Sequence, residues 1–464
     1  MRRAAMLRPA TTGFQGNHMT KSQAVSIDYT LPKVRAHKSN TVRRASLAGG
    51  VGSFVEWYDY GIYGLLVSSL VLVFSSGNMG TSDAGLMLTY LGFTVSFVVR
   101  PFGGIICGYL GDRMGRQKLL AILLLMISLA TAAIGLLPGY ATLGWLAPAL
   151  LILLRIIQGF SAGGEVSGAG SFVAEYAEDH RRAVVMSPLV MGSFIALLFG
   201  SLLITVLMLL LGTGAMNSWG WRIPFLLAIP MALVGVYIRT RIQDTPHFQL
   251  VKSSQRVVRN PIREVLTSRR HLKAIALAIT LPAVNGPGYY ILFVYMPTYL
   301  NKVMHFPQIQ SLMVTACGLL TIVAAIPLMA WLSDRLGRRP LLIASAIMMG
   351  VLAWPCFWLL TLGMMPLACM AAVLLALAFA GHAGVIQATL AEMFPTTVRY
   401  SAYSIGFNLS TVIFGGSAPL LMTWLISLTG IAAIPSFMVM LTAFITLLSA
   451  FTLKETAGKP LNDE

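Results

Sequence analysis

Long apolar stretches recur along nearly the whole chain, and they restrict its fold more than any other feature. A helix that crosses a bilayer needs roughly 20 apolar residues. Only 11% of the residues are charged, against roughly 25% in a soluble domain. The sequence therefore predicts an all-α membrane protein with no large soluble domain. We expect twelve transmembrane helices at 47–74, 85–110, 118–137, 146–174, 184–211, 221–239, 272–300, 311–332, 341–361, 366–393, 401–427 and 432–453.

Basic residues gather in alternate loops, and this placement predicts how the chain is oriented. The first 46 residues hold nine Lys or Arg and one acid, and residues 239–273 hold nine against two. The opposite set of loops holds only Arg222 and Lys302. Cytoplasmic loops are enriched in Lys and Arg, so we expect both termini in the cytoplasm. The net charge of +17 then marks a surface that faces anionic lipid rather than nucleic acid.

Two motifs occur twice, at corresponding places in the two halves of the chain. The segment Gly108–Lys118, GYLGDRMGRQK, is echoed by AWLSDRLGRRP at Ala330–Pro340. An Ala-Glu pair with an Arg seven residues after the Glu also occurs in each half. The repeat predicts two pseudo-symmetric six-helix bundles with a substrate site between them near the bilayer midplane. We expect a basic, disordered tail at 1–46, bundles at 47–238 and 272–453, a basic linker at 239–271 and a short cytoplasmic tail at 454–464.

These loops and the repeat resemble the major facilitator superfamily. Four further segments resemble its metabolite:proton symporter branch: VEWYDYG from Val55, RPFGG from Arg100, RIIQGFSAGGE from Arg155 and WGWRIPF from Trp219. The similarity extends over about residues 45 to 455. It implies a monomeric, multi-pass transporter of a bacterial inner membrane. Such a protein takes up a small organic solute together with protons, and its energy source is the proton gradient rather than a cofactor.

Two segments narrow the expected solute. Tyr289–Tyr299 and Lys454–Leu461 resemble members of the branch that take up proline and glycine betaine. Uptake of an organic acid such as 2-oxoglutarate, citrate or shikimate is the alternative, because both classes of solute carry a carboxylate. A nutrient receptor that does not transport is a remote alternative. No nucleophile triad, metal cluster or pair of catalytic carboxylates stands out, so we expect neither an enzyme nor a metal site.

Charged residues inside the expected spans are expensive to bury and usually functional. Glu56 and Asp59 lie three residues apart in the first helix and so share a face, while Arg100 lies in the second. Low dielectric favours the protonated form of a carboxylate, and a nearby guanidinium opposes this effect. Because arginine keeps its own proton, we expect Glu56 and Asp59 to carry the coupled proton, with Arg100 as their charge partner. A static ion pair between helices is the alternative.

Candidate substrate residues lie in the fourth and seventh helices. The planar fork of Arg155 matches a carboxylate, and Glu165 lies farther along the same helix; pairing of Arg155 with internal acids is the alternative. Asn285 lies among Pro and Gly residues that predict a kinked or unwound helix, and Tyr289 and Tyr290 follow. Aromatic faces suit a quaternary ammonium group. A hinge or gate without substrate contact is equally consistent with this segment.

The repeated loop motifs have a different expected role. The resemblance implies a charge network that holds the two bundles together when the cytoplasmic side is closed. Charge that only sets the topology is the alternative. The expected members of the network are Asp112, Arg113, Arg116, Glu175 and Arg182 in the first half and Asp334, Arg335, Arg338, Glu392 and Arg399 in the second.

Overall fold

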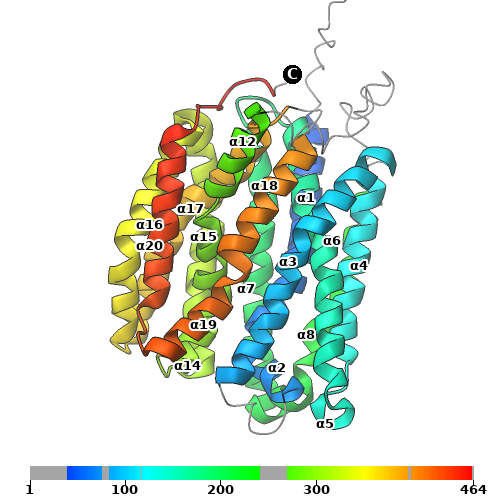
Figure 1. The fold of residues 1–464 in the computed structure, drawn as a ribbon, viewed down its shortest axis with the longest axis vertical. Coiled ribbons are helices and arrows are strands. Elements are labelled where there is room, and N and C mark those ends of the chain that lie inside the picture. The colour runs from blue at the N-terminus through cyan, green and yellow to red at the C-terminus, as the bar shows by residue number, and fades with distance from the viewer. Residues whose placement is uncertain (1–38, 76–82, 115, 241–268, 396–398, 462–464) are drawn as a thin grey trace, which may run out of the picture. The chain divides into compact units, whose positions relative to one another are not determined.

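A computed structural model describes residues 39–75, 83–114, 116–240, 269–395 and 399–461 (Figure 1). Within helices, the side chains at 39–40, 83–84, 108–109, 111–118, 239–240 and 269–271 also lie outside the description. Most of the predicted tail at 1–46 and of the predicted linker at 239–271 falls outside the described residues.

The first half of the chain is mostly helical within its described residues. Its elements are α1 Ser39–Leu65, α2 Val67–Phe74, α3 Asp83–Met114, α4 Arg116–Leu136, α5 Tyr140–Leu143, α6 Leu146–Tyr176, α7 Arg182–Ala215, the π-helix η2 Met216–Gly220, α8 Arg222–Leu226 and α9 Ala228–Thr240. Pro101 and Pro188 lie inside α3 and α7. Neighbouring helices supply the contacts that let a membrane helix tolerate such residues.

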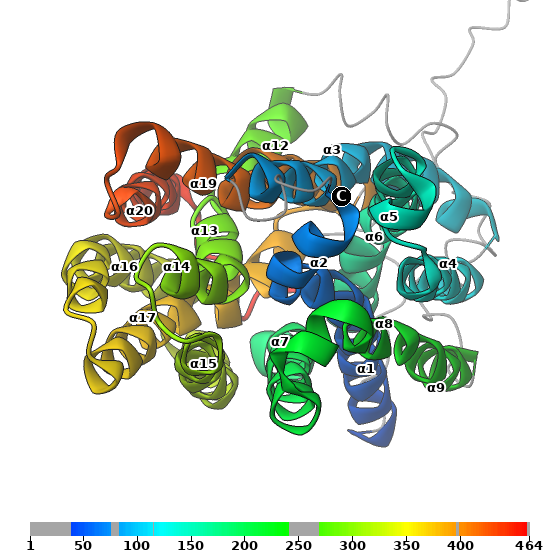
Figure 2. The same cartoon turned by 90° about the horizontal axis from the view of Figure 1, so that it is seen from below.

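The second half repeats this plan. Its elements are α12 Arg269–Thr280, α13 Asn285–Tyr289, the π-helix η3 Tyr290–Tyr295, α14 Met296–Lys302, α15 Gln308–Leu336, α16 Arg338–Thr361, α17 Met365–Glu392, α18 Arg399–Thr411, the π-helix η4 Val412–Gly416, α19 Ala418–Thr429 and α20 Ile434–Thr452. Seen along the helices, the two halves form separate groups that meet along a central seam (Figure 2).

The lengths and composition of the helices fit the predicted spans. Among the described residues, ten spans are long and apolar enough to cross a membrane, and α1 with α2 supplies an eleventh that bends by 64°. The shorter apolar segment Arg222–Ile238 lies where the sixth span is predicted. Large apolar side chains such as Leu210 and Val351 remain exposed, as expected for surfaces in contact with lipid. The predicted all-α membrane fold is confirmed.

The two halves meet through equivalent pairs of helices. In one pair α7 packs against α15, and in the other α3 packs against α18 and α19 (Figure 1). In the first half, α3 is the second span and α7 is the fifth. In the second half, α15 is the second span and α18 with α19 is the fifth. In each pair, therefore, a second span packs against a fifth span of the other half. The seam therefore has the pseudo-symmetry predicted from the repeated motifs, and residues of α1, α6, α13 and α17 lie inside it.

The glycine-rich stretch of α6 allows close helix packing. A Cβ atom on Gly159 would collide with the Ser96 carbonyl group of α3, and one on Gly163 would collide with the Arg100 carbonyl group. The α6 backbone also makes a hydrogen bond across the seam. The Asn408 amide of α18 donates to the Gly163 carbonyl oxygen at 2.9 Å. Small residues thus let three helices approach at the backbone.

The seventh span is broken, as its Pro and Gly residues predict. Helical geometry stops after Thr280 and resumes at Asn285, and a π-helix follows at Tyr290. Freed backbone groups at membrane depth must find new partners. The backbone N–H of Val284 donates to the Thr446 hydroxyl of α20 at 3.0 Å. A Cβ on Gly286 would collide with the backbone of Phe414 in η4, so the irregular segments of two spans pack directly against each other.

Candidate functional site

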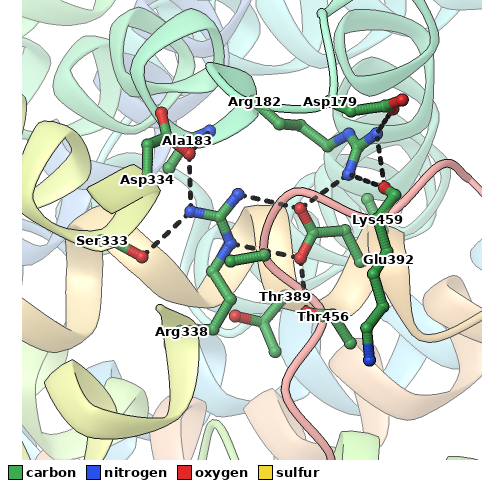
Figure 3. A network of polar contacts seen from close by, with 12 residues as sticks. Asp179, Arg182, Ala183, Ser333, Asp334, Arg338, Thr389, Glu392, Thr456 and Lys459 are labelled. Carbon is green, nitrogen blue, oxygen red and sulfur yellow. Dashed lines mark hydrogen bonds and ion pairs between the residues drawn. The ribbon is translucent and has the colours of Figure 1, made fainter. Parts of the chain in front are cut away.

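One end of the helices carries a charge network that joins the two halves. We call it the basic end; α1 begins there, α20 ends there, and it lies at the top of Figure 1. The buried carboxylate of Glu392, at the last turn of α17, accepts a hydrogen bond from Arg182 Nη1 at 2.8 Å. It also accepts from Arg338 Nη2 at 2.9 Å and Nε at 3.2 Å (Figure 3). One carboxylate thereby holds an arginine from each half.

Two further contacts cross between the halves at the basic end. The Asp334 carboxylate of α15 accepts from the backbone N–H groups of Ala183 and Val184 at 3.1 and 2.9 Å. These are orphan donors of the first turn of α7, where a negative charge is favoured. Arg399 lies 3.3 Å from a Glu175 carboxylate oxygen of the other half. The structure thus brings six predicted gate residues into contacts at the basic end: Glu175, Arg182, Asp334, Arg338, Glu392 and Arg399.

The segment after α20 covers this network. The Glu455 carboxylate accepts from the backbone N–H groups of Arg338 and Arg339 at the start of α16, at 2.9 and 3.1 Å. The Thr456 hydroxyl donates to Glu392, and the Lys459 carbonyl oxygen accepts from Arg182 (Figure 3). Partial burial opposes ionisation of Glu455, but its backbone N–H donors outweigh this effect and hold the pKa of Glu455 below its usual range.

The remaining predicted gate residues do not join the described contacts. Arg335 is exposed, and its guanidinium lies over the Trp331 ring at 4.1 Å. The helical backbone at Asp112, Arg113 and Arg116 is described, but their side chains lie outside the described residues. Within the described residues, the repeated loop motif therefore contributes to the network from the second half, through Asp334 and Arg338.

The halves also touch nearer the opposite end. The Tyr90 hydroxyl of α3 donates to the Thr298 hydroxyl of α14 at 3.1 Å. The Thr94 hydroxyl, one turn deeper, donates to the carbonyl oxygen of Gly416 at 3.1 Å. Polar contacts between the halves therefore lie toward both ends of the helices.

A cavity of about 40 Å³ lies at the seam between these two sets of contacts. This is room for a few water molecules, so a larger solute requires the halves or their side chains to move. Residues of both halves line it, and the polar or aromatic ones are Ser53, Glu56, Trp57, Glu165, Ser193, Phe194, Asn285, Tyr289, Gln387 and Phe407. The predicted substrate residues Glu165, Asn285 and Tyr289 therefore share one cavity.

The two predicted proton carriers have different surroundings. Glu56 lines the cavity, and its carboxylate lies 3.7 Å from Arg100 Nη2. Asp59 is fully buried and accepts a hydrogen bond from the Ser128 hydroxyl of α4 at 2.8 Å. The structure thus brings Glu56 and Arg100 together, whereas Asp59 faces a different helix and is separate from that pair.

Arg155 belongs to a chain of side-chain hydrogen bonds. Its Nη1 donates to Gln158 at 2.8 Å, and its Nη2 donates to Ser96 of α3 at 3.2 Å. The Gln158 amide in turn donates to the Thr131 hydroxyl of α4 at 2.5 Å. The Tyr63 ring covers the Arg155 guanidinium at 4.1 Å. Arg155 therefore already ties α6 to α3 and α4, and it does not line the cavity.

Sequence reasoning missed several aromatic and polar residues of the site. Trp57 lies between Glu56 and the seventh span, with its ring 4.5 Å from that of Tyr289 and 6.3 Å from that of Tyr290. Gln387 of α17 lines the cavity. Trp57 belongs to the segment VEWYDYG, but tryptophan is common in membrane helices. Nothing in its local pattern distinguishes a cavity residue from an interface anchor.

Comparison with known proteins places the chain in a family. Residues 46–260 and 251–463 each match the sugar (and other) transporter family. The chain is 37% identical over 431 residues to the glycine betaine/proline/ectoine/pipecolic acid transporter of Dickeya dadantii, covering 90% of this chain and 85% of the relative. It is 34% identical to the proline/betaine transporter of Escherichia coli K12, covering 93% and 87%.

A third relative and the solved structures agree with this placement. The ectoine/proline transporter of Corynebacterium glutamicum is 34% identical, and the match covers 93% of this chain and 88% of the relative. The proton:xylose symporter XylE, solved with 6-bromo-6-deoxy-D-glucose, has the same fold, with a TM-score of 0.74, 19% identity, and coverage of 92% and 98%. From the matched family and the shared fold, we conclude that this chain is a transporter that belongs to the sugar (and other) transporter family of the major facilitator superfamily.

Proposed function

We propose that the protein is a proton-coupled symporter that takes up proline, glycine betaine or a related zwitterion by alternating access. Glu56 carries this proposal. Its carboxylate lines the cavity between the halves and lies 3.7 Å from the buried guanidinium of Arg100. A single titratable group thus contacts both the space for the solute and a fixed positive charge. Its protonation changes the charge seen by the solute, which is the requirement for coupling.

The charge of the cavity lining favours a zwitterion over an organic acid. Glu56 and Glu165 are the charged residues among those that line the described cavity, and both are acidic. Like charges in a low-dielectric site repel strongly, so a di- or tricarboxylate would be disfavoured. An ammonium group would instead be attracted by these carboxylates and by the faces of Trp57 and Tyr289. The names of the three relatives point to the same class of solute.

We further propose that the basic end faces the cytoplasm of a bacterial cell, with both termini on that side. The excess of Lys and Arg in the loops at this end supports the orientation. Opening toward the cytoplasm then breaks the Arg182–Glu392 and Glu175–Arg399 pairs, and opening outward breaks the Tyr90–Thr298 contact. One chain supplies the cavity and both closures, which supports a monomer as the working unit.

The test is uptake by the purified protein in liposomes. Labelled proline, glycine betaine, 2-oxoglutarate, citrate and shikimate are compared under an imposed pH gradient, with matched vesicles lacking protein. A protonophore and a sodium gradient at equal pH serve as controls for the coupling ion. We expect proline or glycine betaine to accumulate only under the pH gradient. Accumulation of an organic acid alone would reject the zwitterion, and equal uptake without the pH gradient would reject proton coupling.

A further inference from the structure

Arg100 is a buried cation whose hydrogen-bond donors are unused. Its side chain is 0% exposed, and Nε, Nη1 and Nη2 make no hydrogen bond to any described residue. Other buried arginines behave differently, because Arg155 donates to Gln158 and Ser96, and Arg338 donates to Glu392. Buried donors without acceptors are rare in folded proteins and call for an explanation.

The surroundings of Arg100 hold its charge but leave these donors available. Its guanidinium carbon lies 5.4 Å from the ring centre of Trp57, 4.5 Å from that of Tyr60 and 4.7 Å from that of Phe97. Ring faces attract a cation but offer no acceptor to its in-plane N–H groups. These three rings therefore stabilise the charge of the buried guanidinium without using its N–H donors.

Two hydroxyl groups in the same cluster are also unused. Tyr60 OH and Tyr290 OH are buried and have no hydrogen-bond partner among the described residues. The Tyr290 ring lies 5.1 Å from that of Phe97 and 6.3 Å from that of Trp57, so it closes the cluster from the other half of the chain. Unused donors from α1, α3 and η3 thus gather at one point of the seam.

Glu56 balances the charge of Arg100 without taking up its donors. The closest atoms of the pair are 3.7 Å apart, which is beyond hydrogen-bond distance. Because Glu56 and Trp57 line the cavity, a ligand in the cavity is separated from Arg100 by this single layer of side chains. A modest movement of that layer would expose the guanidinium to the cavity.

We propose that Arg100, with the hydroxyl groups of Tyr60 and Tyr290, binds the carboxylate of the transported solute. A carboxylate only accepts hydrogen bonds and matches the guanidinium fork in a bidentate manner. Arg155, the candidate from sequence, is already bonded to Gln158 and Ser96. The cationic end of the solute stays in the cavity beside Trp57, Tyr289 and Glu165. This inference rests on the proposed function, since it requires a solute that bears a carboxylate.

The assignment implies that Glu56 and the solute carboxylate compete for one guanidinium. When the solute carboxylate approaches Arg100, the charge of Glu56 becomes a second anion at the same cation. Solute binding therefore favours protonation of Glu56, and protonation of Glu56 favours solute binding. This coupling links the carboxylate site to the proposed proton carrier. The competition is local and needs no signal transmitted along the bundle.

Equilibrium binding to the purified full-length protein in lipid nanodiscs tests the assignment. The ligands are glycine betaine and choline, which share the trimethylammonium group and differ in the carboxylate. The variants are Arg100→Gln and the matched control Arg155→Gln, another fully buried arginine of the same half. We expect Arg100→Gln to weaken betaine binding roughly 30-fold or more while choline binding changes less than about threefold. Arg155→Gln should leave the betaine-to-choline ratio unchanged.

The outcomes separate this inference from the proposed function. If the unmodified protein binds neither betaine nor proline, the proposed function fails and this assignment fails with it. If betaine binds but Arg100→Gln loses betaine and choline equally, or Arg155→Gln alone loses betaine, the carboxylate site is wrongly placed. Should Arg100→Gln not fold, Tyr290→Phe removes one hydroxyl only. It should weaken betaine roughly fivefold and spare choline, and an equal effect on both ligands would reject the assignment.

Discussion

Replacing Glu392 with glutamine should open the basic end. The substitution keeps the shape of the side chain but removes the charge that Arg182 and Arg338 share. The Arg338 contact joins α16 to α17 within one half, so it survives when the halves separate. Of the two arginine contacts of Glu392, only the one with Arg182, at 2.8 Å, is lost on opening, so it is the one through which Glu392 stabilises the closed state relative to the open one.

The size of the effect follows from that single contact. A hydrogen bond to a charged group contributes about 1.5–3 kcal/mol. A loss near 2 kcal/mol changes the ratio of closed to open molecules roughly 30-fold. Asp179→Asn is the matched control. Asp179 pairs with the same Arg182 but belongs to the same half and is 42% exposed, so its loss should shift the ratio less than about threefold.

Distances between spin labels provide the assay. Labels at Arg181→Cys and Arg335→Cys lie at exposed positions on the two halves near the basic end, in a background without the four native cysteines. Glu392→Gln should transfer most molecules to a longer distance in nanodiscs, and Asp179→Asn should resemble the unmodified protein. Identical distance distributions for Glu392→Gln and the unmodified protein would refute the reasoning, as would a larger shift in Asp179→Asn.

Three further predictions concern coupling, packing and the C-terminal segment. Glu56→Gln should abolish accumulation of solute driven by a pH gradient while solute exchange survives; unchanged accumulation contradicts its role. Gly159→Ala should destabilise the fold by about 1–3 kcal/mol, seen as a lower thermal unfolding midpoint, because its Cβ meets the α3 backbone; Gly214→Ala, in open space, is the control. Glu455 has a depressed pKa, so its anchoring contribution is present above the ordinary Glu pKa, about 4.3, and is lost as pH falls. A spin label at Pro460→Cys should therefore gain mobility on acidification and be mobile at every pH in Glu455→Gln.

The fold was predictable because its signals are strong and repeated. Each span is a long apolar stretch, and the bilayer permits little besides helices at such segments. The break in the seventh span was predictable for the same reason, since Pro282 and Pro287 cannot continue the backbone ladder. The division into two bundles followed from the duplicated loop motifs, which mark equivalent points of each half.

The site was less predictable because burial does not reveal partners. Glu56 and Asp59 share a helix and a spacing, yet one faces Arg100 and the other Ser128. Sequence alone likewise favours Arg155 over Arg100 as the ligand of a solute carboxylate. Their difference depends on Gln158, one turn from Arg155, and on Ser96 of α3, which accept hydrogen bonds from Arg155 Nη1 and Nη2. Contacts of this kind depend on which faces of neighbouring helices meet, and local patterns do not encode that.

The central claim is that solute and proton move together through a cavity controlled by Glu56. The most direct test loads liposomes with a pH-sensitive dye and adds glycine betaine outside, with no imposed pH gradient. The protein should acidify the lumen when betaine enters, and choline should not do so. In liposomes preloaded with unlabelled betaine, Glu56→Gln should exchange it for labelled betaine without acidification. Betaine entry without any change in lumenal pH, or full acidification by Glu56→Gln, would contradict the claim.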